Sequence, residues 1–130
     1  MELEGKARAL FEGPNFAHLA TVNADGSPQV SPVWVDVEDG LIRVNTARGR
    51  VKDRNMTRDP RVALSITDLD DPYIRAYVQG EVAEATEEGA VEHIDDLSEK
   101  YDGVRPYPRL EPGMVRVIYK IRPTKVAGTL

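Results

Sequence analysis

The sequence lacks cysteine altogether and holds only two histidines, His18 and His93. Without thiols the chain can form no disulfide, no zinc-thiolate or iron–sulfur site and no thiolate nucleophile. The two histidines lie far apart, and no HExxH motif or carboxylate-rich loop accompanies them. We therefore expect no metal site, and a reducing compartment, the cytoplasm, as the simplest location.

Long apolar runs are missing as well. No run approaches the roughly 20 residues that a membrane-spanning helix requires, and the N-terminus lacks the basic start and apolar stretch of a secretory signal. The GxSxG turn of many hydrolases, the P-loop and the dinucleotide-binding GxGxxG are also absent. What remains, with 41% hydrophobic and 30% charged residues, is typical of a globular protein. We expect a single domain over residues 1–130 and no membrane association.

Positive charge is scarce overall but concentrated in one segment. The chain has 17 Lys and Arg against 22 Asp and Glu, a net charge of −5. The segment 43–61 reverses this balance, with seven basic and two acidic residues and a local net charge of about +5. The acidic remainder, about −10, would repel a long polyanion, so we expect no nucleic-acid partner. A small phosphorylated cofactor fits this distribution better, and the alternative is a solvated helix face.

The first half of the chain predicts a helix followed by strands joined by short turns. Residues 2–12 have an apolar stripe at helical spacing, and Gly13-Pro14 stops the helix. A period of two then predicts a three-stranded antiparallel meander over 16–22, 29–37 and 41–46, because the turns between these strands contain Asp-Gly hairpin signals. A short helix is expected over 48–58, with Thr46 or Asn45 as its N-cap and Pro60 after its end.

The second half predicts two more strands, a helix and a final strand. Residues 61–67 and 73–86 alternate as strands, and Gly80 indicates a bulge or bend in the longer one. An acidic helix over 87–101 precedes a proline-rich loop, which is a candidate rim or lid, and the last strand covers 114–128. Six or seven antiparallel strands in so short a chain favour a closed or nearly closed barrel, since closure removes exposed edges. The expected fold class is mainly β (α+β), with short flanking helices.

Pro32 interrupts a segment that otherwise has the pattern of a good strand. Proline donates no ladder hydrogen bond, so the strand must bulge or lie at an edge there. The nearby backbone groups of Ser31, Val33 and Trp34 could then bind the polar edge of a flat heterocycle. An ordinary edge-strand proline is the alternative.

The start of the helix over 48–58 is the second candidate site. Its free N–H groups and positive dipole end lie near the hydroxyl of Thr46 and several cations, which predicts an anion pocket. Helical spacing gives two basic stripes, one with Arg48, Lys52 and Asn55 and the other with Arg50 and Arg54. The periodicity leaves open which of them faces the ligand.

Taken together, the segment GSPQVSPVWVDVEDGLIRVNTARGRVKDRNMTRDPRVALSI resembles the pyridoxamine 5′-phosphate oxidase-like split β-barrel superfamily of flavin and deazaflavin enzymes. The likeness runs over most of the chain, from LATVNADGSPQVSPVWV to YVQGEVAEA, and its most specific part is the run from Thr46 to Val62. The length and the order of these pieces look most like the actinobacterial branch that uses the deazaflavin coenzyme F420. The flavin cofactor FMN is the alternative.

The resemblance implies an FMN-binding type of split barrel and a homodimer with two cofactor sites at the subunit interface. It assigns the cofactor phosphate to Thr46, Arg50, Lys52 and Asn55, and the tricyclic ring to Gln29, Ser31, Pro32, Val33 and Trp34. From the other subunit, Tyr73, Gln79 and Gly80 would complete the wall, and Arg48 and Arg54 are candidates for the anionic tail of F420. It assigns no catalytic side chain.

The activity implied by the resemblance is hydride transfer from reduced F420 to a planar conjugated acceptor such as an enone, a lactone or a tetrapyrrole. No side-chain nucleophile is needed, because stacking on the cofactor sets the reaction distance. The proton would come from solvent or from a tyrosine such as Tyr73 or Tyr77. Two alternatives remain: an FMN-binding oxidoreductase of the same fold, and a barrel that binds or stores the cofactor without turnover.

Overall fold

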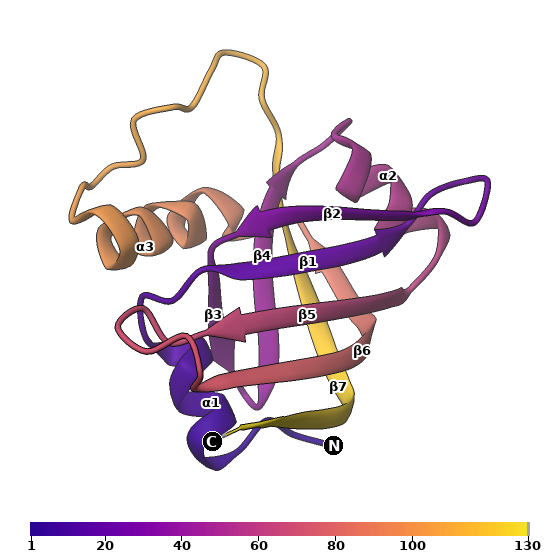
Figure 1. The fold of residues 1–130 in the computed structure, drawn as a ribbon. Coiled ribbons are helices and arrows are strands. Elements are labelled where there is room, and N and C mark those ends of the chain that lie inside the picture. The colour runs from indigo at the N-terminus through magenta and orange to yellow at the C-terminus, as the bar shows by residue number, and fades with distance from the viewer. Residues whose placement is uncertain (130) are drawn as a thin grey trace.

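The computed structural model describes residues 1–129, and in it one seven-stranded antiparallel sheet is flanked by helices (Figure 1). The helices are α1 (Gly5–Glu12), α2 (Val51–Arg58) and α3 (Ala90–Asp102). The strands are β1 (Ala17–Val22), β2 (Pro28–Val33), β3 (Val35–Glu38), β4 (Leu41–Ala47), β5 (Arg61–Thr67), β6 (Arg75–Thr86) and β7 (Arg116–Thr129), in the sheet order β2-β1-β5-β6-β7-β4-β3. Within residues 1–129 no helix is both long and apolar enough to cross a membrane.

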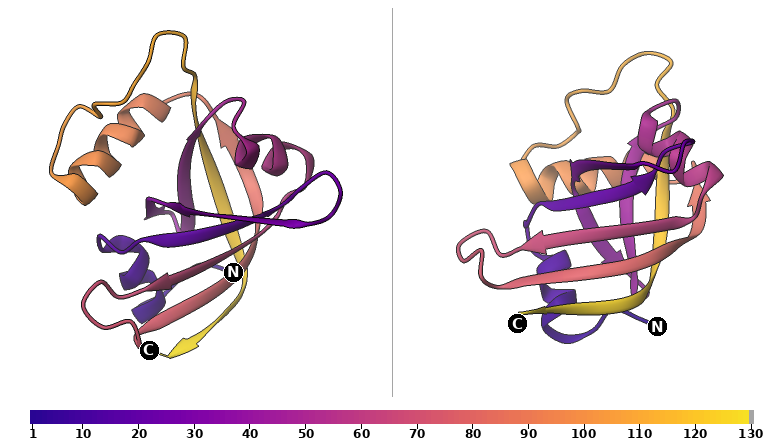
Figure 2. Two further views of the ribbon diagram at one scale, coloured as in Figure 1. Left: turned by 45° about the horizontal axis from the view of Figure 1, so that its top comes forward. Right: turned by 45° about the vertical axis from the view of Figure 1, so that its right-hand side comes forward.

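The sheet curls on itself because its two longest strands bend. In Figures 1 and 2, β1, β2 and β5 run across the molecule, β3 and β4 stand upright, and β6 and β7 belong to both parts. The pairing of β6 with β7 shifts register at Gln79/Gly80 and at Val82/Glu84. A Cβ atom on Gly80 would lie only 2.8 Å from the carbonyl oxygen of Arg122, so a side chain there would force the strands apart. The bend expected at Gly80 is confirmed, and the curled sheet confirms the expected split barrel.

The expected three-stranded meander is wrong, because the chain breaks at Trp34. β2 pairs with β1, whereas β3 pairs with β4, so the two strands lie at opposite ends of the sheet order. Pro32 lies opposite His18 in an edge strand, where its missing N–H costs no ladder bond. The edge position expected at Pro32 is therefore confirmed. Since only Trp34 separates β2 from β3 in the chain, the two edges of the curled sheet meet at this residue.

Alternating residues of the strands fill one interior. Their buried members are Ala17, Leu19, Ile42, Val44, Val62, Leu64, Ile66, Ala76, Val78, Val117, Tyr119 and Ile121. The helix α1 adds Ala7, Leu10 and Phe11 to this core, Leu3 joins them from the segment before the helix, and α1 packs against β3, β6 and β5. The helix α3 packs against β4 and β7, which explains why four successive residues at the start of β7 are buried.

The helix α2 begins at Val51, three residues later than expected. Its N-cap is Arg50, whereas Thr46 and Asn45 lie within β4, so their assignment as N-cap is wrong. The cause is Gly49, whose positive φ of 94° is not helical and ends the preceding turn. The carboxylate of Asp53 accepts a hydrogen bond of 2.8 Å from the N–H of Gly49 and so ties the turn before the helix to its first turn.

Candidate functional site

A cavity of about 440 Å³ lies where the break at Trp34, the start of α2, the helix α3 and the loop before β7 meet. In Figures 1 and 2 this loop arches from α3 over the end of the sheet to β7. The cavity is lined by Phe16, Pro32, Val33, Trp34, Asn45, Arg50, Lys52, Ile94, Asp102, Tyr107, Arg109 and Arg116. It has an aromatic wall and a basic wall.

Trp34 is the centre of the aromatic wall. Its ring stacks on that of Tyr101, with centroids 5.4 Å apart and planes within 7°, and it meets the edge of Tyr107 at 6.1 Å. The ring centroid of Phe16 lies 5.4 Å from that of Tyr101, so Phe16 extends the same cluster. These contacts hold the indole ring in one orientation, so that it offers a preformed surface for a flat ligand.

The backbone at the break is fastened by α3. The N–H of Val35 donates to the hydroxyl of Tyr101 at 3.1 Å, and that hydroxyl donates to the carbonyl oxygen of Asn15 at 2.7 Å. The ammonium of Lys100 donates to the carbonyl oxygen of Val35 at 2.6 Å. Side chains of α3 thus bind the backbone groups that follow Trp34, while Ser31 and Val33 pair with β1.

Arg50, Lys52 and Arg116 form the basic wall. Among residues 1–129, no carboxylate lies within ion-pair distance of these three cations, although Asp102 also lines the cavity. Burial lowers the pKa of Lys52, and repulsion by Arg50 and Arg116 lowers it further. A cluster of mutually repelling cations is stabilised by an anion, so this wall is suited to a phosphate group.

Arg116 is the most deeply buried of these cations, with 4% of its surface exposed. Burial lowers its pKa, Tyr107 opposes that effect and Arg50 adds to it. The guanidinium lies over the ring of Tyr107, 5.5 Å from its centroid, and donates from Nε to Oδ1 of Asn45 at 2.8 Å. No pattern in the sequence marks Arg116 as a site residue, because only the pairing of Ala47 with Arg116 brings β7 beside the start of α2.

Five of the residues assigned to the cofactor by resemblance meet in this cavity, namely Pro32, Val33, Trp34, Arg50 and Lys52. Asn45, Tyr107 and Arg109 join them, although the sequence indicated only a rim for the loop that carries the last two. The aromatic ring of Tyr107 and the positive charge of Arg109 match the character of the predicted residues. The positions of Tyr107 and Arg109 depend on how the loop before β7 folds back, which no local pattern determines.

Four other residues predicted to bind the cofactor phosphate or the anionic tail do not line the cavity. The hydroxyl of Thr46 faces the interior and is buried without a hydrogen-bond partner. Arg48 turns to the other side of α2, where it pairs with Asp53 at 3.0 Å and Glu87 at 2.9 Å. The amide of Asn55 is buried and fastens α2 to the β1–β2 hairpin. The exposed Arg54 lines no part of the cavity either.

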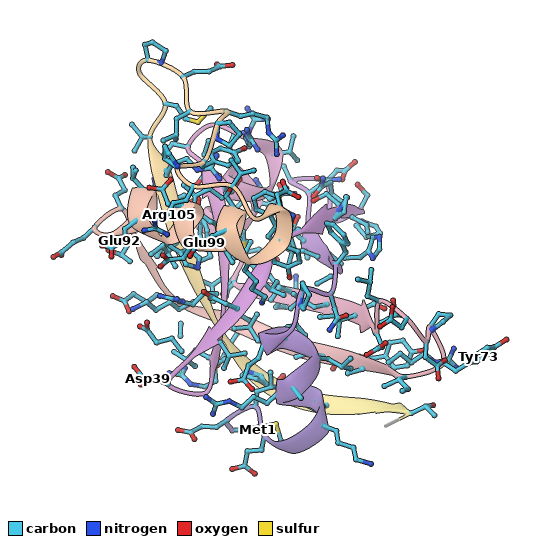
Figure 3. The ribbon with its side chains drawn as sticks, turned by 90° about the vertical axis from the view of Figure 1, so that its left-hand side faces the viewer. Met1, Asp39, Tyr73, Glu92, Glu99 and Arg105 are labelled. Atoms are coloured by element: carbon cyan, nitrogen blue, oxygen red, sulfur yellow. The ribbon has the colours of Figure 1, made fainter. Side chains whose placement is uncertain are left out.

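The remaining predicted residues lie on β2, β6 or a turn. Gln29 accepts a hydrogen bond from Thr21 at 3.1 Å, and the hydroxyl of Ser31 is buried without a partner. Gln79 lines a separate, largely apolar groove of about 410 Å³ on the outer face of the sheet. Tyr73 is 73% exposed in the β5–β6 turn, and Figure 3 shows it projecting away from α3. Within one chain, the structure therefore does not bring these residues to the cavity.

The chain has relatives among known proteins. Residues 3–129 match the pyridoxamine 5′-phosphate oxidase family. The chain is similar to the solved structure of an F420 reductase, at 33% identity and a TM-score of 0.85, over 96% of this chain and 98% of that one. It is also similar to a conserved hypothetical protein from Mycobacterium tuberculosis, at 25% identity and a TM-score of 0.72, over 96% of this chain and 84% of that one.

A NimC/NimA family protein from Clostridium acetobutylicum, 21% identical with a TM-score of 0.65 over 97% of this chain and 89% of that one, shares the fold. The family match covers nearly the whole chain, and the resemblance noted in the sequence is confirmed. The chain belongs to the pyridoxamine 5′-phosphate oxidase family of split β-barrels.

Proposed function

We propose that this protein is a reductase that uses reduced F420 to transfer a hydride to a planar conjugated acceptor. The observation that carries the proposal is the group of cations Arg50, Lys52 and Arg116, which lack a carboxylate partner within residues 1–129 and border the same cavity as Trp34. A phosphorylated tricyclic cofactor offers both an anion for the basic wall and a flat ring for the aromatic wall. Similarity to an F420 reductase supports the deazaflavin over FMN, which is the second candidate.

The residues of the cavity fit such a cofactor in separate roles. Arg50, Lys52 and Arg116 would hold the phosphate, and the chain from Pro32 to Trp34 would border the ring. When bound, the cofactor supplies the hydride. Trp34 and Tyr107 would exclude water from the reacting face, since both rings are held by aromatic contacts. This chain contributes positioning and electrostatic stabilisation rather than a nucleophile.

A homodimer is the second part of the proposal. The outer face of β1, β2, β5 and β6 carries the apolar groove, whose lining includes Val30 and Tyr77, 60% and 46% exposed. Exposed apolar side chains of this kind are typical of surfaces that pack against a partner. Gln79 and Tyr77 border the same groove, so a second copy seated there would cover both, and the resemblance assigns Gln79, with Tyr73 and Gly80, to the wall that the other subunit completes.

Cofactor titration tests the proposal directly. Oxidised F420 and FMN are titrated in parallel with purified protein, and fluorescence polarisation and quenching report binding. We expect micromolar binding of F420, weaker binding of FMN, and a roughly 10- to 100-fold loss with Lys52→Ala, since a hydrogen bond to a charged group contributes about 1.5–3 kcal/mol. Arg54→Ala is the matched control, because it removes an exposed cation of the same helix that does not line the cavity.

The outcomes separate the candidate functions. Tighter binding of FMN than of F420 would identify a flavin protein, and equal losses for Lys52→Ala and Arg54→Ala would exclude this cavity as the phosphate site. Anaerobic incubation of reduced F420 with enone, lactone and tetrapyrrole acceptors then tests turnover. Acceptor-dependent oxidation is expected, whereas binding without it would indicate a storage protein.

A further inference from the structure

A continuous chain of hydrogen bonds runs from β3 through α3 to the basic wall. Arg43 holds the carboxylate of Asp36 through two bonds of 2.8 and 2.7 Å. That carboxylate lies 3.1 and 3.2 Å from Nε2 of His93, and Nδ1 of His93 lies 3.0 Å from the amide nitrogen of Asn45. Oδ1 of Asn45 in turn accepts from Nε of Arg116 at 2.8 Å. The chain therefore ends on a cation of the candidate phosphate site.

The orientation of the Asn45 amide is determined by two partners of fixed character. Arg116 can only donate, so it requires the amide oxygen, and the carbonyl oxygen of Ala90, 2.8 Å from the amide nitrogen, can only accept. If the amide were flipped, its NH2 group would face the donor Arg116 and its oxygen would face the carbonyl oxygen of Ala90, so both hydrogen bonds would be lost. The second N–H of the Asn45 amide must therefore point at Nδ1 of His93.

This orientation dictates the tautomer of His93. Because Asn45 donates to Nδ1, that nitrogen must carry no proton, and the ring proton belongs on Nε2, where it is donated to Asp36. His93 is nearly fully buried, with 2% of its side chain exposed, so its ring cannot exchange these partners for water. The side chain fits its surroundings as the neutral Nε2–H form.

Arg116 needs such support because nothing else fixes the plane of its guanidinium. Its remaining contacts are the ring of Tyr107 and the sulfur of Met114, 3.7 Å from Nη1, and neither is a strong directional acceptor. Within the described chain no carboxylate pairs with it. The bond to Asn45 is thus the directional contact that presents the guanidinium to an anion.

We propose that His93 is a positioning residue, which holds the amide of Asn45 in the orientation that presents Arg116 to the cofactor phosphate. The identity of the anion rests on the proposed function, whereas the hydrogen-bond relay does not. His93 does not line the cavity, so it would act on a bound anion only through Asn45 and Arg116.

The first test needs no ligand. Long-range ¹H–¹⁵N NMR of the protein at pH 8 identifies the tautomer of each histidine, and only His18 and His93 are present, so a His93→Gln sample assigns the signals. The expected result is a proton on Nε2 and none on Nδ1 of His93. The opposite tautomer, or a ring protonated on both nitrogens at this pH, overturns the inference whether or not the cofactor binds.

The second test compares substitutions that replace either the Nδ1 acceptor or the Nε2 donor of the His93 ring. His93→Asn places an oxygen near the position of Nδ1 and can still accept from Asn45, whereas His93→Gln reaches toward Asp36 and His93→Phe fills the volume with no acceptor. We expect the Kd of oxidised F420 to rise about tenfold for Phe and Gln but less than threefold for Asn. The Nε–H resonance of Arg116 should stay protected from exchange only in the wild-type and Asn proteins.

A double-mutant cycle separates positioning from general destabilisation. In an Arg116→Met background, His93→Phe should cause no further loss of F420 affinity, because the group that it positions is gone. An equal loss in both backgrounds, or losses that follow the melting temperatures of the three variants, would overturn the inference. If neither F420 nor FMN binds, the proposed function fails, and the tautomer and the Arg116 exchange rate still decide the relay.

Discussion

Lys100 has an unusual environment for an ammonium group. It donates to the carbonyl oxygens of Phe11 at 2.9 Å and Val35 at 2.6 Å, and it lies 5.0 Å from the ring centroid of Tyr101. No carboxylate of the described residues lies within ion-pair distance of it. Burial lowers the pKa of Lys100 to about 8, although Asp36 and the acid at the end of α1 act in the opposite direction.

This environment predicts a pH-dependent stability. Above about pH 8 the folded protein releases the proton of Lys100, whereas the unfolded chain keeps it to about pH 10.5. In that window the unfolded state binds more protons, so the free energy of unfolding should rise with pH, by up to about 3 kcal/mol. Urea denaturation at pH 7, 8, 9 and 10 measures this slope.

Lys100→Met is the control for this prediction, because it keeps most of the side-chain volume and removes the titrating group. We expect its curve to rise much less between pH 8 and 10 than the wild-type curve, with the remaining rise coming from Lys52, whose pKa is also lowered. If the wild-type and Lys100→Met curves rise in parallel, the rise comes from the titration of another group. The pKa of Tyr101, raised to about 12 chiefly by burial, acts in the opposite sense only above pH 10.

At the scale of elements, the buried amide of Asn55 is one of the groups that join α2 to the sheet. Asn55 donates to Oγ1 of Thr21 at 3.0 Å and to Oδ1 of Asn23 at 2.9 Å, and it accepts from Arg58 at 2.9 Å. Both residues that accept from it precede or begin the β1–β2 turn. The amide therefore sets the position of the helix whose first turn carries Lys52.

Substituting Asn55 with Ala should destabilise the fold more than it weakens cofactor binding. One buried and one partly buried hydrogen-bond acceptor, those of Thr21 and Asn23, lose their donor, which costs about 1–3 kcal/mol. Below the melting transition, we expect the Kd of F420 to change by less than about threefold. Chemical denaturation and cofactor titration on one preparation measure both effects.

A direct role in phosphate binding would give the reverse pattern, with a large change in Kd and a small change in stability. Arg54→Ala should leave both quantities nearly unchanged, since this exposed side chain shares none of the hydrogen-bond partners of Asn55. The comparison therefore decides between the assignment made by resemblance and the fastening role indicated by the hydrogen bonds.

At the scale of the whole molecule, the proposed homodimer would form through the outer sheet face. Val30→Glu places a charge at the edge of the apolar groove, and we expect it to convert a dimer into a folded monomer, because an unpaired charge in an interface is costly. Sedimentation equilibrium measures the mass, and circular dichroism verifies the fold.

Val91→Glu is the matched control, since Val91 is a similarly exposed valine, at 50%, on α3 rather than on this face. It should leave the dimer intact. A monomeric wild-type protein, or equal dissociation by both variants, would contradict the assignment of this face. Loss of F420 affinity in the Val30→Glu monomer would further support a site completed by the second copy.

Local patterns determined the elements of this protein. The period-two segments became strands, the Asp-Gly pairs became turns, and the basic cluster and Pro32 marked the two walls of the cavity. These features depend on backbone dihedrals, side-chain alternation and charge, which neighbouring residues set among themselves. Membership of the split-barrel family also followed from the sequence, because its residues keep a specific order along the chain.

Only the tertiary structure decided which side chains meet. The break at Trp34 sent β3 to the far end of the sheet, and the return of β7 beside β4 brought Arg116 to Lys52, while Arg48 turned to Asp53 and Glu87. Pairing between distant strands is chosen by the burial of a whole apolar face and the closure of the sheet. These are energies of the assembled chain, and no short segment contains them.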